Sequence, residues 1–350
     1  MLQPYSLINS HGKPHIGVFS QPVHDVNYKD TDYRTPLNKR AGKWKKHFHF
    51  KLFQYFGGIS NDIIFGCALA DTAYIGAVFV YVYQISSKKM LTWQFKRPLA
   101  TQLSLTNRPD NGVSTFLTKN KKIHMRYQLN ALGERRKVLD VDFGSELKIH
   151  AEMLESPDFS TMALCTPCSI NGWVYAQKTA ARPVTGELSC NLGHFDLEEQ
   201  QTFGHHDFSA GYMRRETFWN WACFSGQNKA KTKRAKSTNI GLNVSWGVNE
   251  TGYSENCFWI DDTLHPLPAV QFKFDRDDEH STWRIKSLDD RINLSFTPEG
   301  MHKEHLNAMV FATHFKQIFG RFHGYLLTES GKRHDIEDCY GFVEDHYSKW

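Results

Sequence analysis

The feature that most constrains the fold is a repeat of apolar side chains at every second position. Between residues 121 and 129, the apolar side chains are Ile123, Met125, Tyr127 and Leu129, and the residues between them are polar. Successive side chains of a β-strand point to opposite faces, whereas a helix repeats about every 3.6 residues. The run therefore predicts a strand with one face in the core.

The same alternation recurs along the chain, in residues 47–56, 239–246, 270–274 and 292–296. Turn-forming residues separate these runs at the short spacing that is typical of all-β proteins. Amphipathic helices are nearly absent, and only residues 197–202 and 303–309 are candidates for short helical segments. We therefore predict an all-β fold of many antiparallel strands.

The longest apolar run, Ala73 to Tyr83, reads AYIGAVFVYVY. It is too short for a membrane-spanning helix, which needs about 20 residues. Its β-branched and aromatic residues predict a strand that is buried on both faces.

The length of the chain predicts two domains. One antiparallel barrel needs roughly 150 residues, and the chain has 350. A long strand, a polar turn and a return strand occur in Val78–Trp93 and again in Gln317–Ile336. We expect an N-terminal barrel in residues 1–195 and a C-terminal barrel in residues 196–350.

Charge and cysteine usage exclude several classes of protein. The net charge is only +5, and the basic runs at residues 43–46 and 229–236 are predicted to be solvated loops, so no nucleic-acid partner is expected. The odd number of cysteines, seven, and the polar N-terminal sequence predict a protein of the reducing cytoplasm. Phosphate-binding, dinucleotide-binding and serine-nucleophile motifs do not occur, so no nucleotide or redox cofactor is expected.

Several motifs in a fixed order resemble a known family. They are ALADTAYIGAVFVYVY, PCSINGWVYAQK (Pro167–Lys178), GHHDFSAG (Gly204–Gly211), RETFWNWA (Arg215–Ala222), GLNVSWGVNE (Gly241–Glu250) and GFVEDHYSKW (Gly341–Trp350). Together they resemble the bacterial domain of unknown function 2804. That family is distantly similar to AttH and to carotenoid 1,2-hydratase (hydroxyneurosporene synthase), which belong to the lipocalin-like, or calycin, group. The resemblance implies two lipocalin-like antiparallel β-barrel domains packed together.

The segment His205-His206-Asp207 is the first candidate site. In an extended chain, His206 points to the face opposite His205 and Asp207. Three interpretations stay open: a glycine-bracketed turn, an acid/base pair, and a metal site that would need a third ligand. A second candidate, Glu344-Asp345-His346, would supply further acid/base residues or that ligand.

The candidate substrate-binding residues are mainly aromatic. Trp219 and Trp221 share one face of a predicted strand, as barrel core or as the wall of a ligand cavity. Glu255 lies on an apolar face beside Asn256, either paired with a buried arginine (Arg214, Arg215 or Arg321) or functional. The set is completed by Trp173 and Tyr175 of the PCSINGWVYAQK motif.

These residues and the resemblance predict a cofactor-independent acid–base enzyme acting on a hydrophobic, unsaturated isoprenoid or lipid by hydration, isomerisation or cyclisation. A buried carboxyl group would protonate a double bond, and aromatic faces would stabilise the cation. The alternatives are a non-catalytic carrier of hydrophobic ligands and a metal-dependent enzyme. The expected partner is a hydrophobic small molecule or lipid, and the protein is cytoplasmic or peripheral to the inner membrane.

Overall fold

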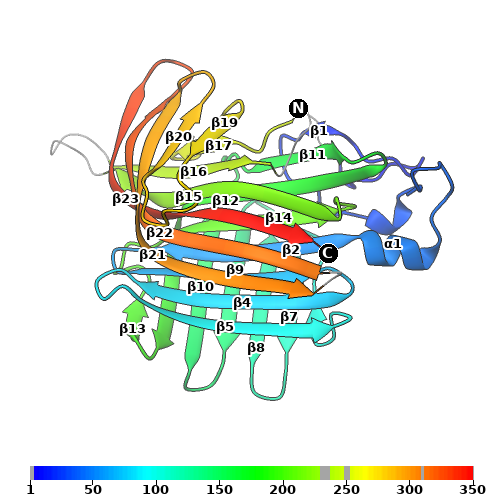
Figure 1. Cartoon of the computed structure of the whole chain (residues 1–350), viewed down its shortest axis with the longest axis horizontal. Coiled ribbons are helices and arrows are strands. Elements are labelled where there is room, and N and C mark those ends of the chain that lie inside the picture. Colours follow the sequence, from blue (N-terminus) through cyan, green and yellow to red (C-terminus); the bar gives the residue numbers. More distant parts are fainter. Residues whose placement is uncertain (1–3, 229–236, 248–252, 309–310, 350) are drawn as a thin grey trace. The chain divides into compact units, whose positions relative to one another are not determined.

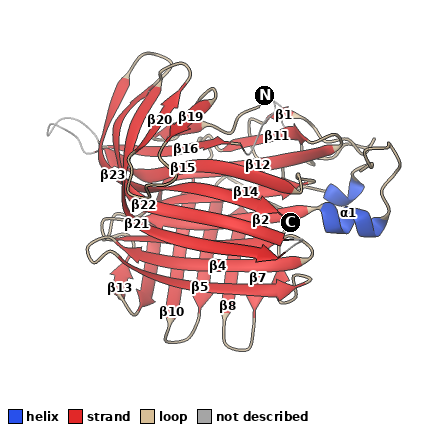
Figure 2. Cartoon of the chain, viewed as in Figure 1, coloured by secondary structure: helices blue, strands red, loops and turns tan. Residues whose placement is uncertain are grey.

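The chain is an all-β protein with one short α-helix among the residues that its computed structural model describes, 4–228, 237–247, 253–308 and 311–349 (Figure 2). It forms two compact units, Met1–Arg214 and Arg215–Trp350. The expected division after residue 195 differs from this one. Strand β14 (Phe203–Gly211) pairs with β12 (Gly172–Cys190) and β2 (Lys51–Ile59), and so belongs to the first unit.

The first unit contains one antiparallel sheet of 14 strands. Its main path runs in the order β5-β4-β3-β2-β14-β12-β10-β9-β8-β7-β6 (Figure 1). The remaining strands are β3 (Ile63–Asp71), β4 (Ile75–Gln84), β5 (Lys89–Pro98), β6 (Leu103–Ser104), β7 (Gly112–Leu117), β8 (Lys122–Leu129), β9 (Arg135–Asp142) and β10 (Leu147–Glu155). Off this path, β11 (Met162–Cys168) joins β1 (Gly17–Val18) to β12, and β13 (Gly193–Asp196) pairs with β12.

This sheet curls over one apolar core. The core brings Phe65 and Val80 of β3 and β4 together with Ile123, Leu139 and Val184 of β8, β9 and β12. Strands near opposite ends of the path therefore pack face to face, as the two walls of a barrel do. Strand β4 is buried on both faces from Val80 to Tyr83, as the run at residues 73–83 predicts, whereas one of its faces is only half-buried before Val80.

The long strand β12 makes the bend possible. Its first half pairs with β11 and its second half with β10. The register with β14 shifts between Thr179 and Arg182, where Ala181 has a φ of 60°. A bulge of this kind bends a strand and increases its twist.

A separate apolar core near the start of β12 includes Phe19 and Val23, so the N-terminal segment covers this part of the sheet.

Local predictions were wrong in two places. The basic run at residues 43–46, which was expected to be a loop, and the start of the alternating run at residues 47–56 form the helix α1 (Lys43–His49), and β2 begins only at Lys51. Residues 303–308, a candidate helix, lie in β21 (Ile292–Ala308). In both places tertiary pairing or packing overrides a weak local preference.

The second unit contains one antiparallel sheet of nine strands in the order β18-β17-β16-β15-β23-β22-β21-β20-β19. They are β15 (Glu216–Asn228), β16 (Thr238–Trp246), β17 (Cys257–Ile260), β18 (Thr263–Pro266), β19 (Val270–Lys273), β20 (Trp283–Ser287), β21, β22 (Phe311–Leu327) and β23 (Arg333–Lys349). Its core joins Leu242 of β16 to Phe272 of β19, so this sheet also curls until β16 and β19 meet.

The prediction of a solvated basic loop at residues 229–236 lies outside the described residues. Among those that are described, no helix is long and apolar enough to cross a membrane.

Candidate functional site

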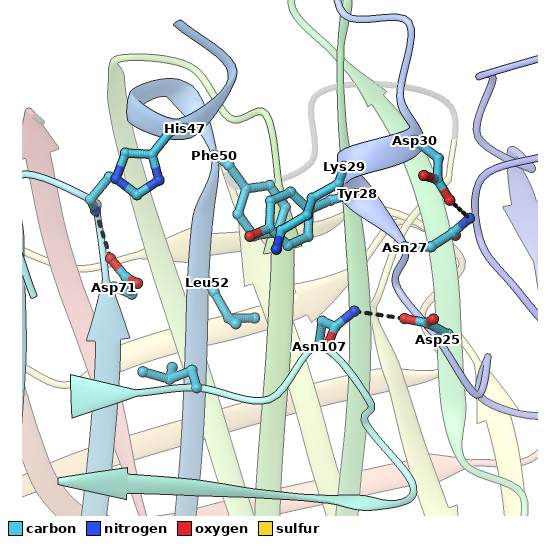
Figure 3. Close-up of a pocket in the computed structure, with 12 residues that line it drawn as sticks. Asp25, Asn27, Tyr28, Lys29, Asp30, His47, Phe50, Leu52, Asp71 and Asn107 are labelled. Atoms are coloured by element: carbon cyan, nitrogen blue, oxygen red, sulfur yellow. Dashed lines mark hydrogen bonds between the residues drawn. The ribbon is translucent and has the colours of Figure 1, made fainter. Parts of the chain in front are cut away.

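The first unit contains a pocket of about 380 Å³ beside the start of β2. Four segments form it: the N-terminal segment around a short 3-10 helix (Tyr28–Asp30), the helix α1 with the beginning of β2, the end of β3 with the turn after it, and the chain after β6 (Figure 3). The lining residues are Asp25, Asn27, Tyr28, Lys29, Asp30, His47, Phe50, Leu52, Asp71, Ala73, Leu105 and Asn107. The pocket therefore combines three carboxyl groups with an aromatic and aliphatic surface.

Aromatic stacking forms the apolar part of the pocket. The rings of Tyr28 and Phe50 lie parallel with their centroids 3.7 Å apart. In Figure 3 they stand between His47 and Asp71 on one side and Asn27 and Asp30 on the other. Parallel rings of this kind present a rigid apolar surface to a ligand.

The carboxyl group of Asp25 lines the pocket and has a perturbed pKa. Burial raises the pKa of Asp25. The positive charge of Arg108 opposes this rise, and the negative charge of Asp30 adds to it. One of its oxygens accepts a hydrogen bond from the amide of Asn107 at 2.6 Å, which fixes its orientation. A carboxyl group with a raised pKa in a pocket is a candidate general acid.

The other two carboxylates are also held in place. Asp30 accepts a hydrogen bond from the amide of Asn27 at 2.8 Å, and Asp71 accepts one from the backbone amide of Ala73 at 2.7 Å. Beside Asp71, the buried ammonium group of Lys51 donates to the carbonyl oxygens of Phe48 and Thr72. Burial lowers the pKa of Lys51 to about 8.

A chain of buried hydrogen bonds runs from the wall of the pocket to His206. The amide of Gln54 donates to the carbonyl of Thr106, the residue between Leu105 and Asn107, at 2.8 Å. The Tyr127 hydroxyl donates to Gln54 Oε1 at 3.2 Å and lies 3.2 Å from His206 Nε2. Burial, with the charges of nearby lysines, lowers the pKa of His206 well below its usual range, so the imidazole is neutral. The chain of hydrogen bonds therefore ends at the backbone next to Asn107.

The interior of the same sheet also holds a buried ion pair that the sequence did not reveal. Lys137 of β9 and Glu155 of β10 form it, and both side chains are almost fully buried. Glu155 also accepts hydrogen bonds from the hydroxyls of Thr179 at 2.6 Å and Thr161 at 3.2 Å. Two ionised groups inside a core persist only when their remaining polar atoms are satisfied, and both oxygens of the Glu155 carboxylate accept hydrogen bonds here.

The segment Gly204–Gly211, for which a turn was one interpretation, is a strand. As the alternation predicts, His206 points to the face opposite His205 and Asp207. The carboxylate of Asp207 pairs with the ammonium group of Lys178 at 2.5 Å and accepts from Ser209 at 2.8 Å. Ring nitrogen Nε2 of His205 lies 3.0 Å from the Tyr55 hydroxyl. His206 and Asp207 therefore do not form an acid/base pair with each other.

Residues 344–346 lie inside strand β23 of the second unit, and no turn forms there. Glu344 accepts hydrogen bonds from Trp219 Nε1 at 3.1 Å and from the Gln317 amide at 3.0 Å. Burial lowers the pKa of His346 to about 3, and its ring lies against Trp219 with centroids 4.0 Å apart. Asp345 points to the other face, where it pairs with Arg276 at 3.2 Å.

Trp219 and Trp221 share a face, as predicted, and it is the face opposite the apolar core of their sheet. The indole nitrogen of Trp221 donates to Asn243 at 2.8 Å, and the amide of Asn243 donates to the carbonyl of Glu255 at 3.0 Å. The Glu255 carboxylate accepts from Ser245 at 2.9 Å. Arg321, one expected partner of Glu255, pairs with Glu299 at 2.8 Å.

The remaining predicted residues are buried hydrogen-bonding or core groups. The amide oxygen of Asn256 accepts from the backbone of Ser245 at 2.6 Å. Trp173 and Tyr175 lie in the core beneath the N-terminal segment, where the Tyr175 hydroxyl accepts from the backbone of Val23 at 3.1 Å. Burial raises the pKa of Tyr175.

Within the residues described, no three histidine, cysteine, aspartate or glutamate side chains lie close enough together to hold a metal ion. The metal hypothesis, which required His205 or His206, Asp207 and His346, therefore has no support from these residues. The catalytic and substrate-binding roles assigned from the sequence stay predictions.

The sequence reasoning missed the pocket residues. The segment Asp25–Asp30, DVNYKD, did contain a signal, because polar residues with turn-forming side chains surround an aromatic one. Its partners, Asp71 and Asn107, are distant in sequence and carry no motif. Only the folded sheet brings Asp71 and Asn107 next to the segment Asp25–Asp30.

Comparison with known proteins assigns the family. The model of the domain of unknown function DUF2804 matches residues 1–350. The chain belongs to the DUF2804 family. No curated protein sequence matches it.

Solved structures are similar to this DUF2804 protein at low sequence identity. CghA, determined with Sch210972, is 11% identical with a TM-score of 0.54, over 99% of this chain and 97% of that chain. Kievitone hydratase from Nectria haematococca is 10% identical with a TM-score of 0.45, over 85% and 89%. An AttH-like protein from Nitrosomonas europaea is 10% identical with a TM-score of 0.46, over 84% and 92%. The likeness to CghA shows a common fold and nothing about the reaction.

Proposed function

We propose that this chain is a cofactor-independent acid–base enzyme, a hydratase or isomerase, whose active site is the pocket beside the start of β2. The observation that carries the proposal is Asp25. Its carboxyl group has a raised pKa and lines a pocket that also contains the stacked rings of Tyr28 and Phe50. The sequence predicted this combination around Asp207 and the tryptophans, and we propose different residues for it.

In the proposed reaction, protonated Asp25 donates its proton to one carbon of a double bond in the bound molecule. The positive charge that develops on the other carbon is stabilised by the carboxylates of Asp30 and Asp71 and packs against the Tyr28–Phe50 surface. Water then bonds to that carbon, and its released proton goes to a carboxylate, so that the sum is addition of one water molecule. In an isomerisation, the same cation loses a proton from a neighbouring carbon.

Asp25 rather than Asp207 is the proposed acid because Asp207 is paired with Lys178. The other oxygen of Asp207 accepts from the hydroxyl of Ser209, and Asp207 does not line the pocket. The substrate class we propose is an unsaturated amphiphile, an isoprenoid or lipid with a polar end. The polar end would hydrogen-bond to Asn27 and Asn107, and the apolar part would contact Phe50, Leu52 and Leu105.

The test uses isotopically labelled water. The protein is incubated with lipid and metabolite extracts in heavy-oxygen water and in deuterated water, and products are followed by mass spectrometry. We expect a molecule that gains heavy oxygen, or deuterium on carbon, with the wild type. Asp25→Asn should abolish this uptake while its unfolding midpoint stays unchanged, because asparagine can still accept the hydrogen bond from Asn107.

The matched control is Asp142→Asn, an exposed aspartate that only caps the turn at Gly144 and should keep full activity. Full uptake by Asp25→Asn would contradict the proposed acid.

The second candidate function is non-catalytic binding of the same class of ligand. It is favoured by the fact that Asp25, Asp30 and Asp71 all accept hydrogen bonds from the protein. Co-purification of an amphiphile with no label uptake by the wild type would identify this function.

A further inference from the structure

An exposed aromatic and basic patch lies on the first unit, next to the pocket. We define the basic aromatic patch as Lys43, Trp44, Lys45, Tyr74 and Leu99. Trp44 is 78% exposed, Leu99 is 65% exposed and Tyr74 is 40% exposed. Single exposed apolar side chains are ordinary, whereas a contiguous group that includes a tryptophan marks an interaction surface.

The patch is contiguous although its residues come from three segments. The ring of Trp44 stacks on Phe48 at the other end of α1, with centroids 6.3 Å apart. Phe48 stacks in turn on Tyr74 at 4.5 Å. The backbone amide of Leu99 donates to the carbonyl of Tyr74 at 2.8 Å, which places Leu99 beside that ring. In Figure 1, α1 lies where β2 begins, at the end of the first sheet.

The chain segment that contains α1 carries charge of one sign. Residues 37–48 contain five lysines and arginines and no acidic residue. The side chains of Lys43 and Lys45 are exposed on either side of Trp44. Lys46 differs, because its ammonium group is bonded to the carbonyl of Thr31. An exposed tryptophan between two solvated lysines is the arrangement that fits the headgroup region of an anionic bilayer.

We propose that the basic aromatic patch docks this protein on the surface of a membrane that contains anionic phospholipids. Trp44, Tyr74 and Leu99 enter the headgroup region, and Lys43 and Lys45 contact the lipid phosphates. The exposed rings favour a lipid surface over a nucleic acid, because the cations extend over one short helix and do not line a groove.

Docking at this patch would bring the pocket to the bilayer. His47 of α1 lines the pocket, and so does Ala73, the residue immediately before Tyr74. An amphiphile could then pass from the membrane into the pocket without crossing water. This last step rests on the proposed function, whereas the docking itself does not.

The test is sedimentation with sucrose-loaded vesicles of three parts phosphatidylcholine to one part phosphatidylserine, compared with vesicles of phosphatidylcholine alone. We expect the full chain to sediment with the anionic vesicles and to be released by high salt. Each lysine at an anionic surface contributes about fivefold to partitioning, so replacing Lys43 and Lys45 together by serine should weaken binding about 25-fold. Trp44→Ser should weaken it about tenfold, from the loss of partly inserted apolar surface.

The matched control is Trp246→Ser, because Trp246 is 53% exposed but lies on β16 of the second unit. Leu99→Ser changes the patch at a residue outside α1. Weaker vesicle binding by this variant therefore cannot be caused by unfolding of the short helix. Failure of the wild type to bind anionic vesicles at low ionic strength would overturn the proposal. Equal weakening by Trp246→Ser would also overturn it. So would binding of a single-stranded oligonucleotide through the same lysines without any vesicle binding. None of these results depends on turnover, so they leave the proposed function to its own test.

Discussion

Removing the charge of Glu155 should strongly destabilise the first unit. The Lys137 and Glu155 side chains are 1% and 0% exposed, so Glu155→Gln leaves a buried ammonium group without its counter-ion. Breaking a buried pair in this way costs about 3–5 kcal/mol. For a unit the size of Met1–Arg214, that loss corresponds to a fall in the unfolding midpoint of roughly 6–20 °C.

The loss should depend on pH in a defined direction. Burial lowers the pKa of Lys137, and the charge of Glu155 opposes this effect. Without the charge of Glu155, the pKa of Lys137 in the folded protein should fall further, while the unfolded chain binds its proton up to about the ordinary lysine pKa of 10.4. The unfolded state then binds more protons, so the stability of the variant should rise with pH and approach that of the wild type under alkaline conditions.

Urea denaturation from neutral to alkaline pH measures both effects. The control is Arg136→Gln, which breaks the neighbouring pair Arg136–Glu152 on the same two strands. The Arg136 side chain is 47% exposed, so we expect a loss of about 1 kcal/mol or less. Combining Lys137→Met with Glu155→Gln should recover most of the stability, because no unpaired charge remains. If Glu155→Gln cost no more than Arg136→Gln, the reasoning from burial would be refuted.

Two further predictions concern the surroundings of the pocket. Tyr127→Phe removes the hydroxyl between His206 and Gln54 and should lower the free energy of unfolding by about 1–3 kcal/mol in urea denaturation, whereas the exposed Tyr5→Phe should change it by less than about 0.5 kcal/mol. Lys51 has a pKa of about 8 in the folded protein, below the 10.5 of the free side chain. Between pH 8 and pH 10.5 the unfolded chain therefore binds a proton that the folded protein does not, so the free energy of unfolding should rise with pH in this range. Lys51→Met should remove that rise, and an unchanged slope of stability against pH would contradict the assignment.

The sequence predicted those features of the fold that depend on local pattern. Alternation at residues 121–129 gave the correct inner face of β8, because one buried face of a strand requires apolar residues at every second position. The same rule placed His206 opposite Asp207. Local glycine and aspartate signals at Gly204–Gly211 also suggested a turn, but strand pairing satisfies the backbone of that segment.

The candidate site depended on contacts between distant segments. Asp25 and Asn107 meet across 82 residues, and Tyr127 and His206 across 79. No local period encodes such pairs, because register and curl place them only when the sheet closes over its core. The sequence by itself therefore determined an all-β chain of two parts and the face on which each strand side chain lies. Only the tertiary structure decided which carboxyl group is buried beside an aromatic wall, because burial, and with it the shift in pKa, arises from the packing of segments that are far apart in the chain.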